Sequence, residues 1–159
     1  MREAIGSTFI INLIIIFVIV FIVLFAASTN YTKAFKVKNR IISIIEENNG
    51  YNPTAKEQIE TFLGETGYRI SYKGCKKSDY HYQREIAGVK NGIAGGNWES
   101  VPSGSNYKYC IEKVTTKNGE IEQTFYGVTA YAYFEFPLLS SLIEIPVYGE
   151  TKTMGLMGK

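Results

Sequence analysis

Two cysteines and one histidine are the residues of this chain best suited to chemistry. Cys75 lies six residues before His81 in a lysine-rich segment, and nearby lysines lower the pKa of a thiol and favour a reactive thiolate. Alternatively, a disulfide between Cys75 and Cys110 would close a loop of about 35 residues, worth roughly 3 to 4 kcal/mol in the chain-entropy model. If this part of the chain lies in an oxidising compartment, we favour the disulfide.

The other polar residues indicate neither catalysis nor metal binding. Only one of the 15 acidic residues is an aspartate, Asp79, whereas Ca²⁺ and Mg²⁺ sites draw on clustered aspartates. Two cysteines and one histidine do not complete a four-ligand zinc site, and the common phosphate-loop, dinucleotide and metalloprotease motifs do not occur. The net charge is +2, without a basic stripe interleaved with aromatics. We therefore predict a protein that is not an enzyme and has no cofactor, no metal and no nucleic-acid partner.

An apolar segment near the N-terminus predicts a membrane anchor. Residues 9–27 carry no charge, and Asn12 is their one strongly polar side chain. Nineteen helical residues at about 1.5 Å each nearly span the roughly 30 Å hydrocarbon core of a bilayer. A cleavable secretory signal is the alternative, with residues 26–28 as its small-residue site, but its apolar run is normally shorter. We therefore predict an uncleaved single-pass anchor.

The pattern beyond the anchor predicts that the helix continues. No Gly or Pro follows until Gly50, and the spacing of the apolar residues becomes that of an amphipathic helix. A break near residues 28–30 is the alternative. At 100° per residue the following share one half of the helix, with Lys38 the one charged exception: Ala34, Phe35, Val37, Ile41, Ile42, Ile44 and Ile45.

The remaining sequence predicts a small α+β head. A helix is expected from Pro53, with Thr54 and Glu57 at capping-box spacing, followed by a short strand at 68–72. Residues 73–106 are expected to form a long loop with a brief strand at 86–89. Strands are expected at 107–116, 121–136 and 143–148, with a tight hairpin at Asn118-Gly119, an edge strand at Pro146 and a frayed tail at 153–159.

The predicted fold class is α+β, with a long transmembrane-plus-amphipathic helix packed on a small antiparallel sheet. Its parts are a leader and anchor (1–30), a helix extension (31–50) and a head (51–159).

Two indications of the head's orientation conflict. Only Arg2 precedes the anchor, whereas Lys33, Lys36, Lys38 and Arg40 follow it. The positive-inside rule then puts the head in the cytoplasm. Two cysteines, in contrast, suit an oxidising compartment outside it.

The start of the chain resembles the short leader of a type IV prepilin. Residues 1–6 precede residues 7–12 of the apolar run, and in that family a peptidase cuts after a glycine just before the run. The cut would here follow Gly6 and leave Ser7 first. Ile11 stands where pilins usually carry Glu, as in accessory pseudopilins that lack it. Residues 134–139 and 145–152 resemble the end of TadE-like pseudopilins of tight-adherence pili.

This resemblance implies a non-catalytic pseudopilin subunit of a bacterial pilus or of a type II secretion-like apparatus. Its partners would be membrane lipid and other pilin-like subunits or assembly proteins, with an extracytoplasmic head on the cell membrane or in a surface filament. The alternatives are a membrane-anchored extracytoplasmic binding domain that does not polymerise and a thiol-dependent enzyme using Cys75 or Cys110. The helix residues that would mediate assembly are Phe9, Asn12, Phe17, Phe21, Phe35, Ile41 and Ile45.

Overall fold

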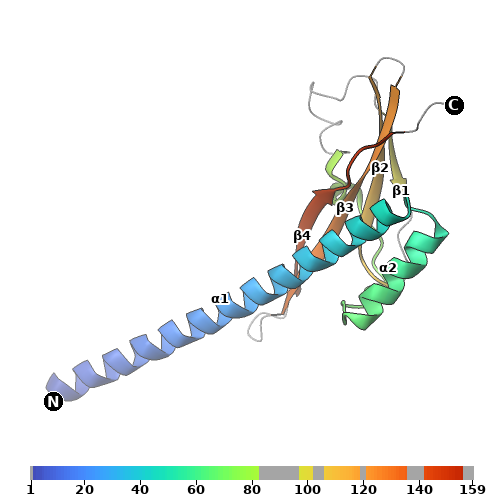
Figure 1. The fold of residues 1–159 in the computed structure, drawn as a ribbon. Helices are drawn as coiled ribbons and strands as arrows, with labels where there is room; N and C mark the ends of the chain where they lie inside the picture. The colour runs from blue at the N-terminus through green and yellow to red at the C-terminus, as the bar shows by residue number, and fades with distance from the viewer. Residues whose placement is uncertain (1, 83–96, 102–105, 119–120, 136–141, 156–159) are drawn as a thin grey trace.

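One long helix dominates the structure (Figure 1). This computed structural model describes residues 2–82, 97–101, 106–118, 121–135 and 142–155. Helix α1 (Arg2–Glu47) runs through residues 28–30 without a break, as predicted. Its Thr8–Glu47 part is long and apolar enough to cross a membrane, and its most apolar stretch is not covered by the rest of the chain. In this respect the chain has the features of a single-pass membrane protein.

The turn between the two helices is built by asparagines and a glycine. Asn49 and Gly50 adopt positive φ angles of 52° and 136°, and the amide of Gly50 donates to the carbonyl of Ile45 at 2.9 Å, which ends α1. Helix α2 (Pro53–Glu65) is capped at its N-terminus by Asn52, whose side chain accepts a hydrogen bond from the amide of Ala55. The expected cap at Thr54 is therefore wrong. Proline is well suited to the first helical position, so the extended residue before it is the cap.

The strands form one antiparallel sheet, which together with the helices confirms the α+β class. Its strands are β1 (Asn97–Val101), β2 (Cys110–Asn118), β3 (Ile121–Glu135), β4 (Leu142–Glu150) and β5 (Met154–Gly155). The order is β1-β2-β3-β4, and β5 also pairs with β3. β4 is an edge strand, as its Pro146 predicted, because proline has no amide to donate to a further neighbour. A short 3₁₀ helix, η1 (Lys77–Asp79), precedes the sheet.

Three local expectations differ from the structure. Strand β1 lies inside the predicted loop 73–106, where it pairs with Ile111–Thr115 of β2. Residues 68–72 contribute only one bridge, from Ile70 to Tyr107, instead of a strand. The tail pairs through Met154 and Gly155 with β3 instead of fraying at 153. The expected strand at 86–89 and the turn residues 119–120 lie outside the described residues, although Asn118 pairs with Ile121 across that turn.

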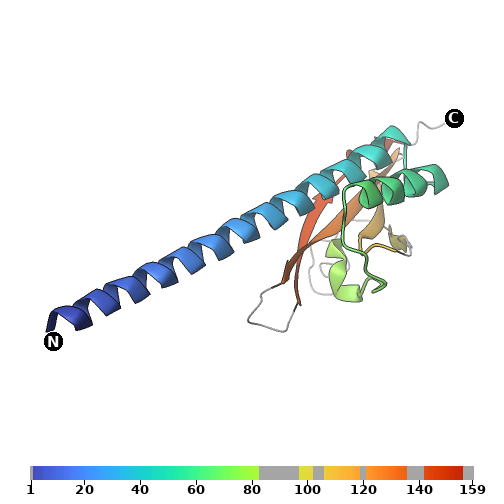
Figure 2. The same cartoon turned by 90° about the horizontal axis from the view of Figure 1, so that it is seen from below.

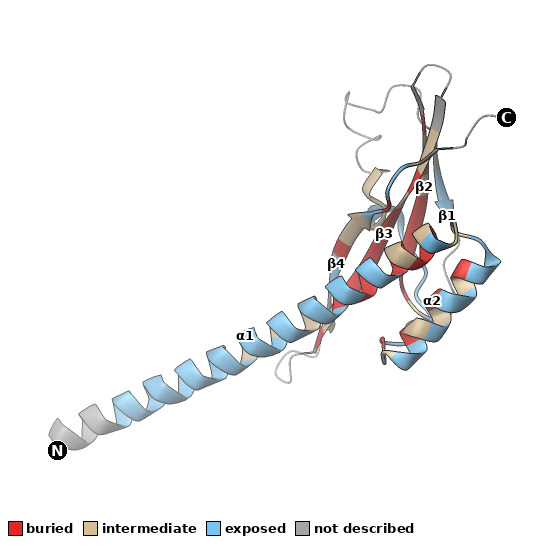
Figure 3. Cartoon of the chain, viewed as in Figure 1, coloured by how far each residue is buried: buried red, intermediate tan, exposed pale blue. Residues whose placement is uncertain are grey.

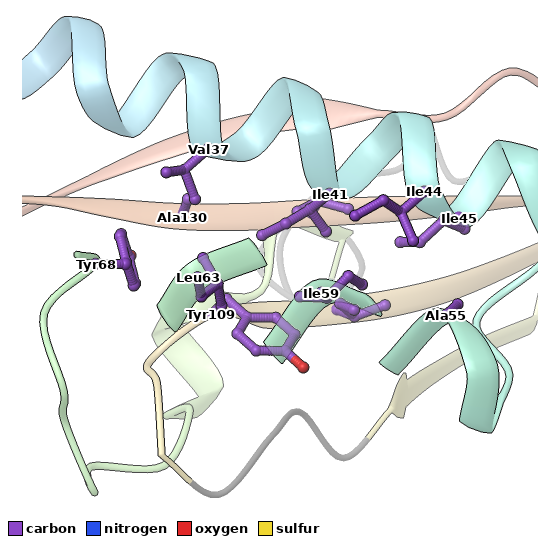
Figure 4. Packing of buried hydrophobic residues seen from close by; sticks show 12 residues of the cluster. Val37, Ile41, Ile44, Ile45, Ala55, Ile59, Leu63, Tyr68, Tyr109 and Ala130 are labelled. Carbon is purple, nitrogen blue, oxygen red and sulfur yellow. The ribbon is translucent and has the colours of Figure 1, made fainter. Parts of the chain in front are cut away.

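The second half of α1 and helix α2 cover one face of the sheet, and η1 lies on the other face (Figure 2). The buried side of α1 starts where the helix meets the sheet (Figure 3). Small residues on β3, Ala130 and Ala132, face this helix and are buried. They let the helix approach the sheet closely, as helix and sheet must to exclude water. The main core consists of Val37, Ile41, Ile44, Ile45, Ala55, Ile59, Leu63, Tyr68, Tyr109, Ile111, Val128 and Ala130 (Figure 4).

Candidate functional site

The first half of α1, here called the bare half of α1 (residues 8–26), exposes a long run of apolar side chains. Phe9, Phe17 and Phe21 are exposed, with Phe17 at 67%, and Asn12 is exposed between them. Phe17 and Phe21 stack on one another with ring centroids 6.5 Å apart. A continuous apolar surface of this kind is unstable in water, so lipid or another apolar surface must cover it. Among the described residues, the bare half of α1 is thus the surface best suited to contact lipid or another apolar surface.

The predicted assembly residues separate into two groups. Ile41 and Ile45 are fully buried against the chain's own sheet and α2, so they hold the head together. Their role in assembly stays a prediction about the helix to which they belong. Phe35 is 45% exposed, with the ammonium of Lys38 4.2 Å from its ring centre. Helical periodicity places all three in one apolar half, and only the position of the sheet distinguishes the buried stripe from its margin.

Cys75 and Cys110 are joined in a disulfide, as favoured from the sequence, with their Cα atoms 5.8 Å apart. The bond links the segment before η1 to the first residue of β2. Neither sulfur is a thiolate nucleophile in this state. His81 stacks instead on Tyr148, with ring centroids 4.5 Å apart. The structure therefore does not support a Cys75–His81 nucleophilic pair.

In the described part of the head, a buried lysine two residues before Cys110 forms a charged cluster with two carboxylates. The side chain of Lys108 is 5% exposed, and its Nζ donates to Glu144 Oε2 at 2.7 Å. Asp79 Oδ2 lies 3.8 Å from the same nitrogen, and the ring centre of Tyr131 lies 4.1 Å away. The carboxylates and the ring compensate the ammonium for the water it loses. No sequence pattern predicts this cluster, because its members come from η1, from the residue before Tyr109 and from β4, with no shared spacing.

A buried carboxylate on β2 was also missed by the sequence analysis. Glu112 is 1% exposed, and its two oxygens accept hydrogen bonds from the backbone amides of His81 and Tyr82, each at 3.2 Å. A Cβ on Gly127 would lie 2.7 Å from Glu112 Cγ, so a glycine is needed opposite it. The carboxylate thus fastens residues 81–82 to the sheet, which is a structural role.

The buried hydroxyl of Tyr68 ties the segment after α2 to the backbone of β3. The hydroxyl of Tyr68 accepts from the amide of Tyr131 at 2.8 Å and lies 3.1 Å from the carbonyl of Lys108, to which it can donate. Burial raises the pKa values of Tyr68 and Tyr131, and it raises that of Tyr133 to about 12. These hydroxyls therefore stay protonated at physiological pH and do not act as bases there.

The head's polar clusters are thus occupied by contacts within the chain. Within the described residues no group of three or more His, Cys, Asp or Glu side chains is arranged to hold a metal ion. The bare half of α1 is accordingly the main candidate functional site. Comparisons with protein-family models, with curated protein sequences and with solved structures find no match to this chain.

Proposed function

We propose that this chain is a non-catalytic pilin-like (pseudopilin) subunit of a bacterial surface pilus or secretion apparatus, and that it assembles through its N-terminal helix. The observation that carries the proposal is the continuity of α1. One helix of 46 residues supplies both the exposed apolar anchor and a wall of the head's core. A subunit that must move from a membrane into a helical assembly needs such a rigid connection between its helix and its head.

The rigidity follows from how α1 is held. Val37, Ile41 and Ile45 are fully buried, so tilting the helix relative to the sheet would open cavities in the core. Removing one such isoleucine side chain costs about 2 to 5 kcal/mol, and moving the whole helix would cost several times more. A domain that only displays a binding site gains nothing from this, since a flexible linker after the anchor would serve it equally well.

We further propose that the head is extracytoplasmic and that the leader is cut after Gly6. The disulfide supports the orientation, because disulfides persist in oxidising compartments and are rare in the cytoplasm. We give the disulfide more weight than the basic residues after the anchor, because those residues include Lys38, which is buried in the head. The glycine before the apolar run supports the cut, through the resemblance to prepilins.

The intact mass of the chain purified from its native membrane tests the processing step. We expect a mature chain that starts at Ser7, and a Gly6→Leu variant that retains all six leader residues. An intact Met1 in the wild type would contradict processing, and a start near Ser28 would identify a cleaved secretory signal instead.

Cross-linking between copies tests assembly. Since Cys75 and Cys110 are paired, a Phe17→Cys variant carries one reactive thiol, on the bare half of α1. We expect it to form covalent dimers in native membranes. Tyr72→Cys is the matched control, because Tyr72 is 81% exposed but lies on the head. Dimers of Phe17→Cys no more abundant than those of the control would favour the binding domain that does not polymerise.

A further inference from the structure

The edge of the head where α1 meets β4 exposes large side chains that are mainly apolar. Each of them is 40 to 49% exposed, and together we call them the β4 flank: Tyr31, Phe35, Ile143 and Ile145. The partners of the two isoleucines on β3 are buried with α1, so both isoleucines lie on the face of the sheet that α1 covers. Lys38 places its ammonium over the ring of Phe35 and packs closely on Gly149, so Phe35 lies on the β4 side of α1.

The contacts between β4 and α1 give the level of this flank along the helix. Val147 is buried with Ala34, and further along both elements the amide of Lys152 donates to Glu46 Oε1 at 2.7 Å. β4 therefore runs beside α1, and its first residues lie toward the bare half of the helix (Figure 1). Two strand residues cover about 7 Å, slightly more than one helical turn of about 5 Å. Ile145 and Ile143 thus lie roughly one and two turns nearer to the anchor than Ala34.

These levels coincide with the headgroup layer of a bilayer. If residues 9–27 fill the hydrocarbon core, Tyr31 lies about 6 Å beyond its edge, at about 1.5 Å per helical residue. On the same scale Ile145 lies about 5 Å beyond the edge, and Ile143 lies close to it. The headgroup layer is roughly 5 to 7 Å thick on each side of the core. Phe35 begins about 12 Å beyond the edge, but helical side chains lean toward the N-terminus, which here is the direction of the membrane.

We propose that the β4 flank lies in the headgroup layer, so that lipid contacts the head as well as the anchor. Apolar side chains gain free energy there by leaving water, and tyrosine is enriched at this depth. Pro146 on this edge strand has no amide to donate, which disfavours the alternative that a strand of a second copy covers the edge. The inference rests on the membrane anchor and does not require polymerisation, so it holds or fails separately from the proposed function.

Spin labels on single introduced cysteines measure whether lipid, water or protein surrounds each position. The native disulfide leaves the introduced thiol as the reactive one. The full-length chain is placed in vesicles of phosphatidylcholine and phosphatidylglycerol, and the label is exposed to oxygen, which concentrates in lipid, or to a nickel chelate, which stays in water. We expect a label at Ile143→Cys to be accessible to oxygen and to lose most of its access to nickel. A label at Ile15→Cys, on the bare half of α1, is the reference for lipid.

Two further variants complete the test. Tyr31→Cys repeats the measurement from α1 and should give the same pattern as Ile143→Cys. Thr54→Cys is the reference for water, because Thr54 is exposed in the first turn of α2, at the end of the head away from the anchor. Nickel access at Ile143→Cys and Tyr31→Cys equal to that at Thr54→Cys would overturn the proposal by placing the flank in water. Low access to both reagents would also overturn it, by showing that protein covers the flank.

Discussion

Replacing an isoleucine in each half of α1 distinguishes the role of the second half in the head's core from the role of the first half as an exposed anchor. Ile41 is fully buried in the head's core, whereas Ile15 is 50% exposed on the bare half of the helix. Truncating a fully buried isoleucine to alanine costs 2 to 5 kcal/mol, so Ile41→Ala should destabilise the head by about 3 kcal/mol. Ile15→Ala leaves a side chain that faces lipid or detergent in both the folded and the unfolded head, so it should change the head's stability by less than about 0.5 kcal/mol.

Thermal melting followed by near-ultraviolet circular dichroism in detergent measures this difference. All 12 tyrosines and the single Trp98 lie outside residues 9–27, so the tyrosine and tryptophan bands of the signal report the chain beyond the anchor. For a head of this size a loss of 1 kcal/mol lowers Tm by about 4 °C, which gives a shift of about 12 °C for Ile41→Ala. Ile15→Ala should shift Tm by less than 2 °C. Equal shifts for the two variants would refute the conclusion that the second half of α1 is part of the head's core.

Three further results follow from the contacts in the head. Reducing the disulfide between Cys75 and Cys110 should lower the free energy of unfolding by about 3 to 4 kcal/mol, seen as a lower Tm with a phosphine reductant; an unchanged Tm would contradict it. Glu144→Leu should cost about 2 to 3 kcal/mol of unfolding free energy, because it leaves the ammonium of Lys108 buried with the weaker partner Asp79. Lys108→Met should cost less, since the carboxylates that it leaves unpaired are closer to solvent. Urea titrations that reverse this order would refute the argument. Burial raises the pKa of Tyr133 to about 12 from its usual 10, so the folded state holds this proton more tightly than the unfolded state. The stability that this contributes below pH 10 should be lost as the pH rises toward 12. Denaturation midpoints that stay constant over this range would contradict the prediction.

Helix α1 was predictable because its signals are local. An uncharged apolar run, a 3.6-residue period and the absence of Gly or Pro before Gly50 depend on neighbouring residues only. The hairpin pairing of β2 with β3 was predictable for the same reason, from Asn-Gly between two alternating segments. The partners of the disulfide were predictable without a structure, because the chain has just two cysteines, Cys75 and Cys110.

The remaining features depend on the fold as a whole. The charged cluster forms only because η1 packs against the sheet, which brings together Lys108, Asp79 and Glu144. Their spacing in the sequence does not predict this contact. Strand β1 carries polar residues and follows a glycine-rich stretch, so its pairing with β2 overrides a sequence with weak strand preference. Ile41 and Phe35 lie in the same apolar half of a helical wheel, and the position of the sheet makes one a core residue and leaves the other at the surface.

The unbroken helix also fixes the direction in which each side of the anchor points. At 100° per residue, Asn12 lies about 40° around the helix axis from Ala34, which is buried under the sheet, so Asn12 lies on the same side as the head. Phe17 and Phe35 each lie about 100° from Ala34 and Phe21 about 140°, so the three share a neighbouring side. A second helix that packs against these phenylalanines would therefore place its own head beside this head at a set angle. The contact between helices and the contact between heads cannot be adjusted independently, because a rotation at one end of α1 is a rotation at the other.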